Sequence, residues 1–155
     1  MQLYIHAITH QPDVWLRDAE LHYLHRIPKP YSLDIHHISP NKRDKYRSVD
    51  EIKNAEASLL LKNTAPRDFL CYLDPYGKPL TSEAFSTTLS QWREQHTTVR
   101  FMLGGAEGHS KDALSNAHAT LSLSTMPLPH GLARLLLVEQ IYRAIMIQNK
   151  HPYHR

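Results

Sequence analysis

The chain has 155 residues, and its 18 lysines and arginines against 15 aspartates and glutamates give a formal net charge of +3. This length suits one domain, residues 1–155, and a pI near 9.0 is compatible with an acidic partner without requiring one. The single cysteine, Cys71, excludes a disulfide framework and a cysteine-based zinc site, and no apolar run approaches the ~20 residues of a membrane span. We therefore expect a cytoplasmic, non-membrane protein.

The first half of the chain alternates strand and helix patterns. Its predicted elements are a strand at 2–8, a helix at 13–26, a strand at 31–38 and a helix at 48–63. Asp13 is the expected cap of the first helix, with Trp15 and Leu16 on its inner face. The residues Ser-Val-Asp-Glu at 48–51 form a capping box that starts the second helix.

A basic loop separates the second strand from the second helix. It contains Lys42, Arg43 and Lys45, with Tyr46 beside them. Basic side chains next to an aromatic ring suit contact with RNA phosphates and bases. A solvated surface loop explains the same composition, so both interpretations stay open.

The second half continues the alternation. Its predicted elements are a strand at 69–73, a helix at 82–95, a strand at 99–103, a short helix beginning near Glu107, a strand at 120–124 and a helix at 131–148. Asp-Pro-Tyr-Gly at 74–77 indicates a turn that ends the strand before it. Five strands alternating with five helices predict an α/β fold, with a largely parallel sheet and helices on both faces.

Three predicted strands end at Leu73, Gly104 and Ser124. Ligands of parallel sheets bind beyond the carboxyl ends of the strands, so these breaks predict one pocket. The turn Gly-Gly-x-x-Gly at 104–108 lacks the spacing of a dinucleotide fingerprint, and no Walker-type phosphate loop is present.

The last predicted helix is unusually apolar, because twelve of the sixteen residues at 132–147 are apolar. It can be buried against its own sheet and a second copy of the chain, or wholly inside one domain. Arg134 falls on its buried line and therefore needs either an ion-pair partner or a ligand.

The tail His-Pro-Tyr-His-Arg at 151–155 combines a rigid proline, a stacking ring, a proton-transferring imidazole and a guanidinium. These groups suit an enzyme acting on a nucleobase, although short termini are also often frayed and inert. The histidine pairs at 22 and 25 and at 151 and 154 lack the H-E-x-x-H pattern, so a metal site is not expected.

Three stretches carry a resemblance: LGGAEG at 103–108, LSLSTMPLPHGLAR at 121–134 and NKHPYHR at 149–155. Together they resemble the small bacterial methyltransferases of the SPOUT class, in particular the ribosomal large-subunit RNA methyltransferase H family. The resemblance implies a C-terminal deep trefoil knot, a homodimer and S-adenosylmethionine as cofactor. It places the cofactor-binding loops at Leu73, Gly104, Leu123, Ser124, Thr125, Met126, Pro127 and Leu128.

The implied substrate is a pseudouridine of large-subunit (23S) ribosomal RNA in the assembled ribosome, methylated at N3. On this interpretation Tyr153 stacks on the base, His154 accepts or relays its proton and Arg155 stabilises charge, while Lys42, Arg43 and Lys45 contact RNA. The chain departs from the family pattern at Ala106 and Gly131, where proline is common. A dimeric RNA-binding factor without catalysis, and a histidine-bound metal enzyme, are the alternatives.

Overall fold

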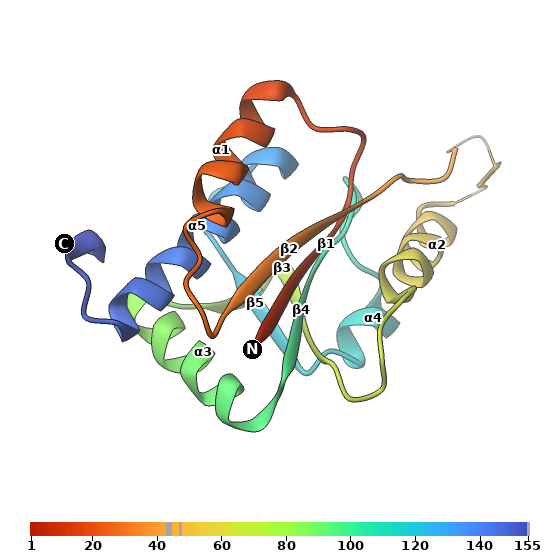
Figure 1. Ribbon diagram of the computed structural model, residues 1–155. Helices are drawn as coiled ribbons and strands as arrows, with labels where there is room; N and C mark the ends of the chain where they lie inside the picture. The colour runs from red at the N-terminus through yellow and green to blue at the C-terminus, as the bar shows by residue number, and fades with distance from the viewer. Residues whose placement is uncertain (43–44, 47, 155) are drawn as a thin grey trace.

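The computed structural model describes residues 1–42, 45–46 and 48–154, the last of them by its backbone alone. Its strands and helices alternate along the chain (Figure 1). In order they are β1 Gln2–Ile8, α1 Val14–Leu24, β2 Ser32–Ile38, α2 Val49–Leu61, β3 Phe69–Pro79, α3 Ser82–Gln95, β4 Thr98–Leu103, α4 Lys111–Ser115, β5 Ala119–Ser122 and α5 His130–Gln148. A short 3₁₀ turn, Pro152–His154, follows.

The strands form one five-stranded sheet in the order β2-β1-β4-β3-β5. Every strand pair is parallel. All the carboxyl ends therefore lie at the same edge of the sheet, and the predicted α/β class is confirmed.

Helices cover both faces of the sheet (Figure 1). On one face α5 packs between α1 and α3, and Leu3, Phe101, Leu137 and Ile141 belong to the apolar core there. On the other face α2 and α4 cover a smaller cluster that includes Leu60. Cys71 is fully buried in the larger core, as its apolar surroundings in the sequence predicted.

The helix starts follow the capping signals in part. The Ser48 hydroxyl accepts a hydrogen bond from the Glu51 amide, so Ser48 caps α2 as the capping-box pattern predicted. Asp13 stands at the N-cap of α1 but makes no side-chain cap bond. The expected inner position of Leu16 is confirmed, whereas that of Trp15 is wrong, since its side chain is 55% exposed. Glu20 is the other buried residue of α1.

Strand β3 is longer than its apolar run predicts. The expected turn at residues 74–77 lies inside the strand as an irregularity, and pairing with β5 resumes at Lys78. A Cβ atom added to Gly77 would lie 2.9 Å from the backbone N and C of Leu121, so glycine permits this close approach. The chain therefore bulges just after Leu73, where the strand meets the candidate site.

Arg134 of α5 is buried, and its partner is Glu20 of α1. The Arg134 Nε lies 2.5 Å from the Glu20 Oε1, and the two side chains are 1% and 3% exposed. Of the two predicted partners for Arg134, an ion pair or a ligand, the structure shows the ion pair. Among the described residues, neither terminal nitrogen of Arg134 has a hydrogen-bond partner.

Candidate functional site

A cavity of about 440 Å³ opens at the carboxyl ends of β4 and β5 and at the bulge of β3 after Leu73. Its walls are mostly leucine, proline and glycine, with few polar groups. The lining residues are Leu73, Asp74, Pro75, Leu103, Gly104, Gly105, Ala106, Gly108, His109, Leu121, Ser122, Leu123, Ser124, Met126, Pro127, Leu128, His130 and Ala133. This size and apolar character are typical of a small-molecule site.

The three predicted strand ends meet in this cavity. Of the predicted cofactor-binding residues, Leu73, Gly104, Leu123, Ser124, Met126, Pro127 and Leu128 line it. Thr125 is exposed to solvent and does not line it. The topology explains the meeting, because β3 lies between β4 and β5 and all three strands run in one direction.

The loop after β5 is shaped by its own hydroxyl groups. The Ser124 Oγ accepts a hydrogen bond of 2.9 Å from the Met126 amide, and the Ser122 hydroxyl donates to the Ser124 carbonyl. Pro127 and Pro129 fix their φ angles and have no amide hydrogen to satisfy. The Met126 side chain is 73% exposed. The loop thus presents a rigid backbone and an apolar side chain at the mouth of the cavity.

Two histidines that sequence reasoning did not assign to the site form its inner wall. The Nε2 of His109 lies 3.1 Å from the Met102 carbonyl oxygen, and the Nε2 of His130 lies 2.7 Å from the Gly104 carbonyl oxygen. A carbonyl only accepts, so each Nε2 carries the hydrogen and donates. Burial lowers the pKa of both imidazoles, although their hydrogen bonds to backbone oppose the shift. Both rings are therefore neutral near pH 7.

A buried carboxylate of α2 accepts a hydrogen bond from the loop that lines the cavity. Glu56 of α2 is 7% exposed, and its Oε2 accepts a hydrogen bond of 3.1 Å from the Gly105 amide. Sequence reasoning also missed this residue. The sequence did indicate that Glu56 is buried, because it stands four residues after Ile52 and four before Leu60, on the apolar face of α2.

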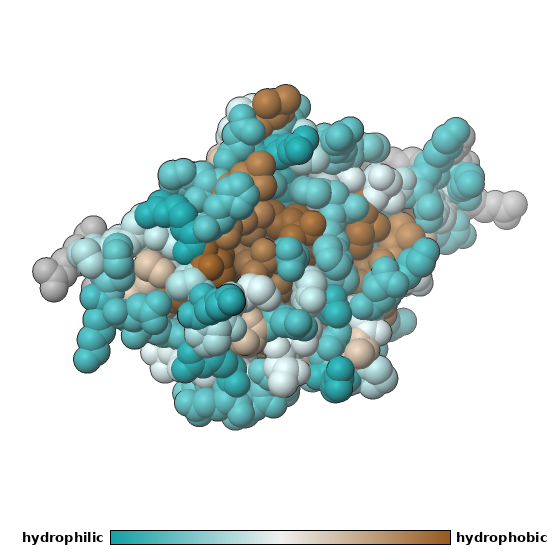
Figure 2. Space-filling view, in the orientation of Figure 1, coloured by the Kyte–Doolittle hydropathy of each residue, from teal (hydrophilic) through white to brown (hydrophobic). Residues whose placement is uncertain are grey.

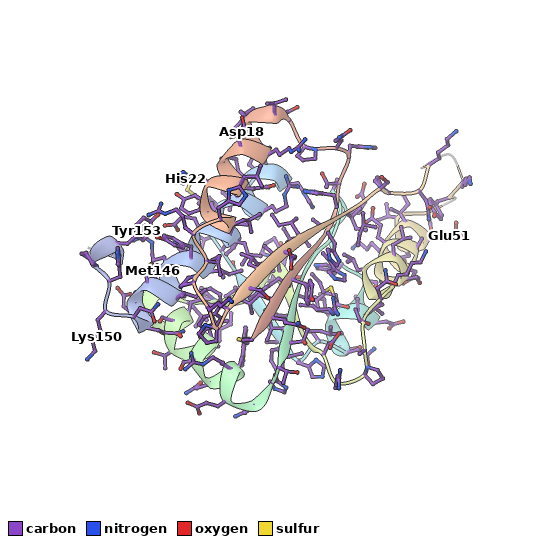
Figure 3. All side chains as sticks on the ribbon, in the orientation of Figure 1. Asp18, His22, Glu51, Met146, Lys150 and Tyr153 are labelled. Atoms are coloured by element: carbon purple, nitrogen blue, oxygen red, sulfur yellow. The ribbon has the colours of Figure 1, made fainter. Side chains whose placement is uncertain are left out.

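The tail folds back onto α5 and α1 through Tyr153. Its hydroxyl donates to the Glu139 Oε1 at 3.2 Å, and its oxygen also lies 3.4 Å from the Tyr23 hydroxyl oxygen. The Arg143 guanidinium lies 5.1 Å from the Tyr153 ring centre. Figure 3 shows Tyr153 beside the C-terminal half of α5, near Met146. Burial raises the pKa of Tyr153, and Tyr23 and the Glu139 carboxylate add to that shift. The hydroxyl therefore remains a donor at neutral pH.

The other predicted polar residues are only partly described. Lys42 and Lys45 are exposed, and the Lys45 amide donates to the Lys42 carbonyl across the loop. Arg43, Arg155 and the side chain of His154 lie outside the described residues.

The cavity and Tyr153 lie at different levels of α5. His130 at the start of the helix lines the cavity, whereas the Tyr153 hydroxyl contacts Glu139. Ala133 also lines the cavity, and the six residues of α-helix from it to Glu139 span about 9 Å along the axis. Tyr153 therefore does not reach the cavity of its own chain in this arrangement.

Apolar side chains are exposed around the first two turns of α1 and of α5, the helix whose start lines the cavity. They are Val14, Trp15, Leu132 and Leu136. The two helix starts are adjacent, since a Cβ atom added to Gly131 would lie 2.6 Å from the Leu16 Cδ1. Figure 2 shows further apolar side chains between α1 and the edge strand β2. A second hollow there is lined in part by Leu21, Leu24 and Ile35.

Within the described part of the chain, no group of three or more histidine, cysteine or acidic side chains is placed to hold a metal ion. None of the described helices combines the length and apolar character needed to cross a membrane.

The parallel sheet and the apolar cavity at its carboxyl edge define an α/β protein with a preformed small-molecule site. The family model described as "Predicted SPOUT methyltransferase" matches residues 1–154, and the chain belongs to this family. The resemblance inferred from the three C-terminal stretches is thereby confirmed.

Relatives that match over the full length of the chain are also named as methyltransferases. Proteins named "Ribosomal RNA large subunit methyltransferase H" from Nitrosomonas eutropha and Methylobacillus flagellatus are 37% and 34% identical over 155 residues, covering 100% of this chain and 99% of each relative. The protein of that name from Pseudomonas putida is 34% identical, with 100% of both chains covered.

Proposed function

We propose that this chain is an S-adenosylmethionine-dependent methyltransferase that modifies N3 of a pseudouridine in large-subunit (23S) ribosomal RNA on assembled ribosomes, in the cytoplasm. The observation that carries the proposal is the cavity in which Leu73, at the bulge of β3, meets Gly104 and Ser124 from the loops after β4 and β5. The family membership and the names of the full-length relatives support it. We also propose a single domain, residues 1–155, whose C-terminal part is threaded into the trefoil knot of this family.

The residues of the cavity fit S-adenosylmethionine. Apolar walls from Leu103, Leu121 and Leu128 suit the adenine ring and the carbon chain, while the loop after β5 supplies backbone groups and the Ser124 side chain. About 440 Å³ is within the range of sites for ligands of this size. Leu73, Gly104 and residues 123–128 are the proposed cofactor contacts. The cofactor supplies a methyl group on a sulfonium leaving group, and no metal is needed.

The protein must align the base and remove a proton. N3 of pseudouridine carries a hydrogen at neutral pH, so this hydrogen must leave as a proton when N3 takes the methyl group that the bound cofactor would supply. We assign the proton to His154, stacking and hydrogen bonding to Tyr153, and stabilisation of the developing negative charge to Arg155. The tail supplies all three groups.

The geometry favours a homodimer in which the tail of one copy completes the cavity of the other. Tyr153 does not line its own cavity, and its hydroxyl contacts α5 about 9 Å along the axis from Ala133, the cavity-lining residue of that helix nearest to it. The exposed Leu132 and Leu136 lie on the helix whose His130 and Ala133 line the cavity, so a second copy covering them would bring its own residues close to that cavity. Replacing Leu136 with aspartate should yield monomers by sedimentation and abolish methyl transfer while the monomer remains folded. Full transfer by a monomeric variant would contradict the arrangement.

Mixed dimers test the shared site directly. A Gly104→Val chain with a blocked cavity and a His154→Ala chain with a defective tail should each be inactive alone. When they are co-expressed and purified by two different tags, the mixed dimer regains one site, because the intact cavity of one chain meets the intact tail of the other. No regained activity in a verified mixed dimer would show that tail and cavity of the same chain work together.

The basic loop is the proposed contact with ribosomal RNA phosphates. Replacing Lys42, Arg43 and Lys45 with alanine should weaken ribosome binding and lower the slope of log affinity against log salt by up to about 2 to 3, because fewer counterions are released. Cofactor binding should not change. A salt slope equal to that of the wild type would remove the loop from the RNA-binding surface.

A further inference from the structure

One peptide bond in the wall of the cavity has both of its polar groups held by side chains. The carbonyl oxygen of Gly104 accepts from the His130 Nε2 at 2.7 Å, and the amide of Gly105, on the same peptide, donates to the Glu56 Oε2 at 3.1 Å. His130 belongs to α5 and Glu56 to α2, which cover opposite faces of the sheet. The peptide is thus fixed from two sides.

Two glycines make such a restraint necessary. A peptide between glycines rotates with little steric resistance, and a rotated peptide would point its oxygen or its N–H in a different direction. The space around it also requires glycine, since a Cβ atom on Gly105 would lie 2.6 Å from the Glu56 Oε1 and one on Gly104 would lie 3.1 Å from the His109 ring. Glycine thus permits the close contacts, while the side chains fix the orientation.

We propose that Glu56 and His130 act as positioning residues that fix the orientation of the Gly104–Gly105 peptide and thereby preform the cofactor wall. The inference rests on the proposed binding of S-adenosylmethionine in this cavity and extends it to two residues outside the predicted set. Neither residue needs to touch the reacting atoms. Their effect is to lower the conformational entropy that the loop loses when the cofactor binds.

The first test needs no cofactor. Amide hydrogen exchange of the full-length protein should be faster at Gly105 in Glu56→Ala than in the wild type, because the acceptor of that amide is gone. Glu56→Gln keeps an oxygen acceptor in the same place and should restore most of the protection. Exchange at Gly105 that is equal in wild type and Glu56→Ala would overturn the proposal.

The second test is calorimetric titration with S-adenosylmethionine. We expect Glu56→Ala and His130→Ala each to raise Kd about tenfold, the range for one lost hydrogen bond to a charged or buried partner, with Glu56→Gln and His130→Gln within about threefold of wild type. Glu94→Ala, an exposed carboxylate on α3, is the matched control and should leave Kd unchanged. Because both side chains hold one peptide, the double alanine variant should raise Kd by less than the product of the single effects.

The titrations distinguish an error in the proposed function from an error in the positioning proposal. If the wild type does not bind S-adenosylmethionine, the proposed function is wrong. If the wild type binds and the folded Glu56→Ala and His130→Ala variants bind equally well, with only their melting temperatures lowered, the two residues have a purely structural role and the positioning proposal is overturned.

Discussion

Removing the Glu20 carboxylate should destabilise the fold strongly, because Arg134 would then be left buried and unpaired. The guanidinium is 1% exposed, its Nε contacts Glu20 at 2.5 Å, and its two terminal nitrogens have no partner among the described residues. Breaking a buried ion pair by removing one partner typically costs about 3–5 kcal/mol. In a chain of this size that corresponds to a fall in Tm of roughly 6–20 °C.

Urea denaturation followed by circular dichroism measures this change. The free energy of unfolding of Glu20→Ala should be lower by about 3–5 kcal/mol, and the Glu20→Ala/Arg134→Met double variant should recover part of it, because methionine removes the uncompensated charge. Asp18→Ala is the control, since Asp18 lies exposed on the same helix (Figure 3) and should change stability by less than about 0.5 kcal/mol. A loss below about 1 kcal/mol for Glu20→Ala would refute the argument.

Three further predictions concern stability. Burial lowers the pKa of His6 and His109 from 6.5, so below that pH the unfolded chain binds more protons than the folded chain. The contribution of these histidines to the free energy of unfolding is therefore complete above pH 6.5. Below pH 6.5 it falls by about 1.4 kcal/mol per pH unit for each histidine that stays neutral when folded. Calorimetry at pH 5 and 7 that gives the same stability would contradict this. Gly77→Ala should lower the free energy of unfolding by about 1–3 kcal/mol, because its Cβ would lie 2.9 Å from the Leu121 backbone, and an unchanged urea midpoint would disprove that contact. Thr81→Ala removes the cap of α3 and should cost about 1 kcal/mol by the same assay, whereas Thr81→Ser should retain the cap.

The sequence predicted the fold class well because local signals and the global pattern agree. The apolar run at the start of β3 and the capping box at Ser48 each mark their element, and five strands alternating with helices leave a parallel sheet as the natural arrangement. The meeting of Leu73, Gly104 and Ser124 was predicted from the rule that the carboxyl ends of parallel strands share an edge, although at Leu73 it is a bulge inside β3 that opens to the cavity.

What the sequence did not reveal depends on contacts between distant segments. Glu56 and Gly105 lie 49 positions apart, and His130 and Gly104 lie 26 apart, so neither hydrogen bond has a local signature. The rotation of α1 that exposes Trp15 was missed because periodicity defines an apolar face only to within one or two residues. The continuation of β3 past residues 74–77 was missed because the turn residues there form a bulge beside β5.

Methyl transfer is measured by incubating the purified protein with labelled S-adenosylmethionine and ribosomes from a strain that lacks this activity. Separated subunits and naked ribosomal RNA serve as parallel substrates, and mass spectrometry of the RNA locates the label. We predict label at N3 of one pseudouridine of the large-subunit RNA, with assembled ribosomes as the best substrate. Tight binding to ribosomes without any methyl transfer would contradict the account and would indicate an RNA-binding factor that does not catalyse.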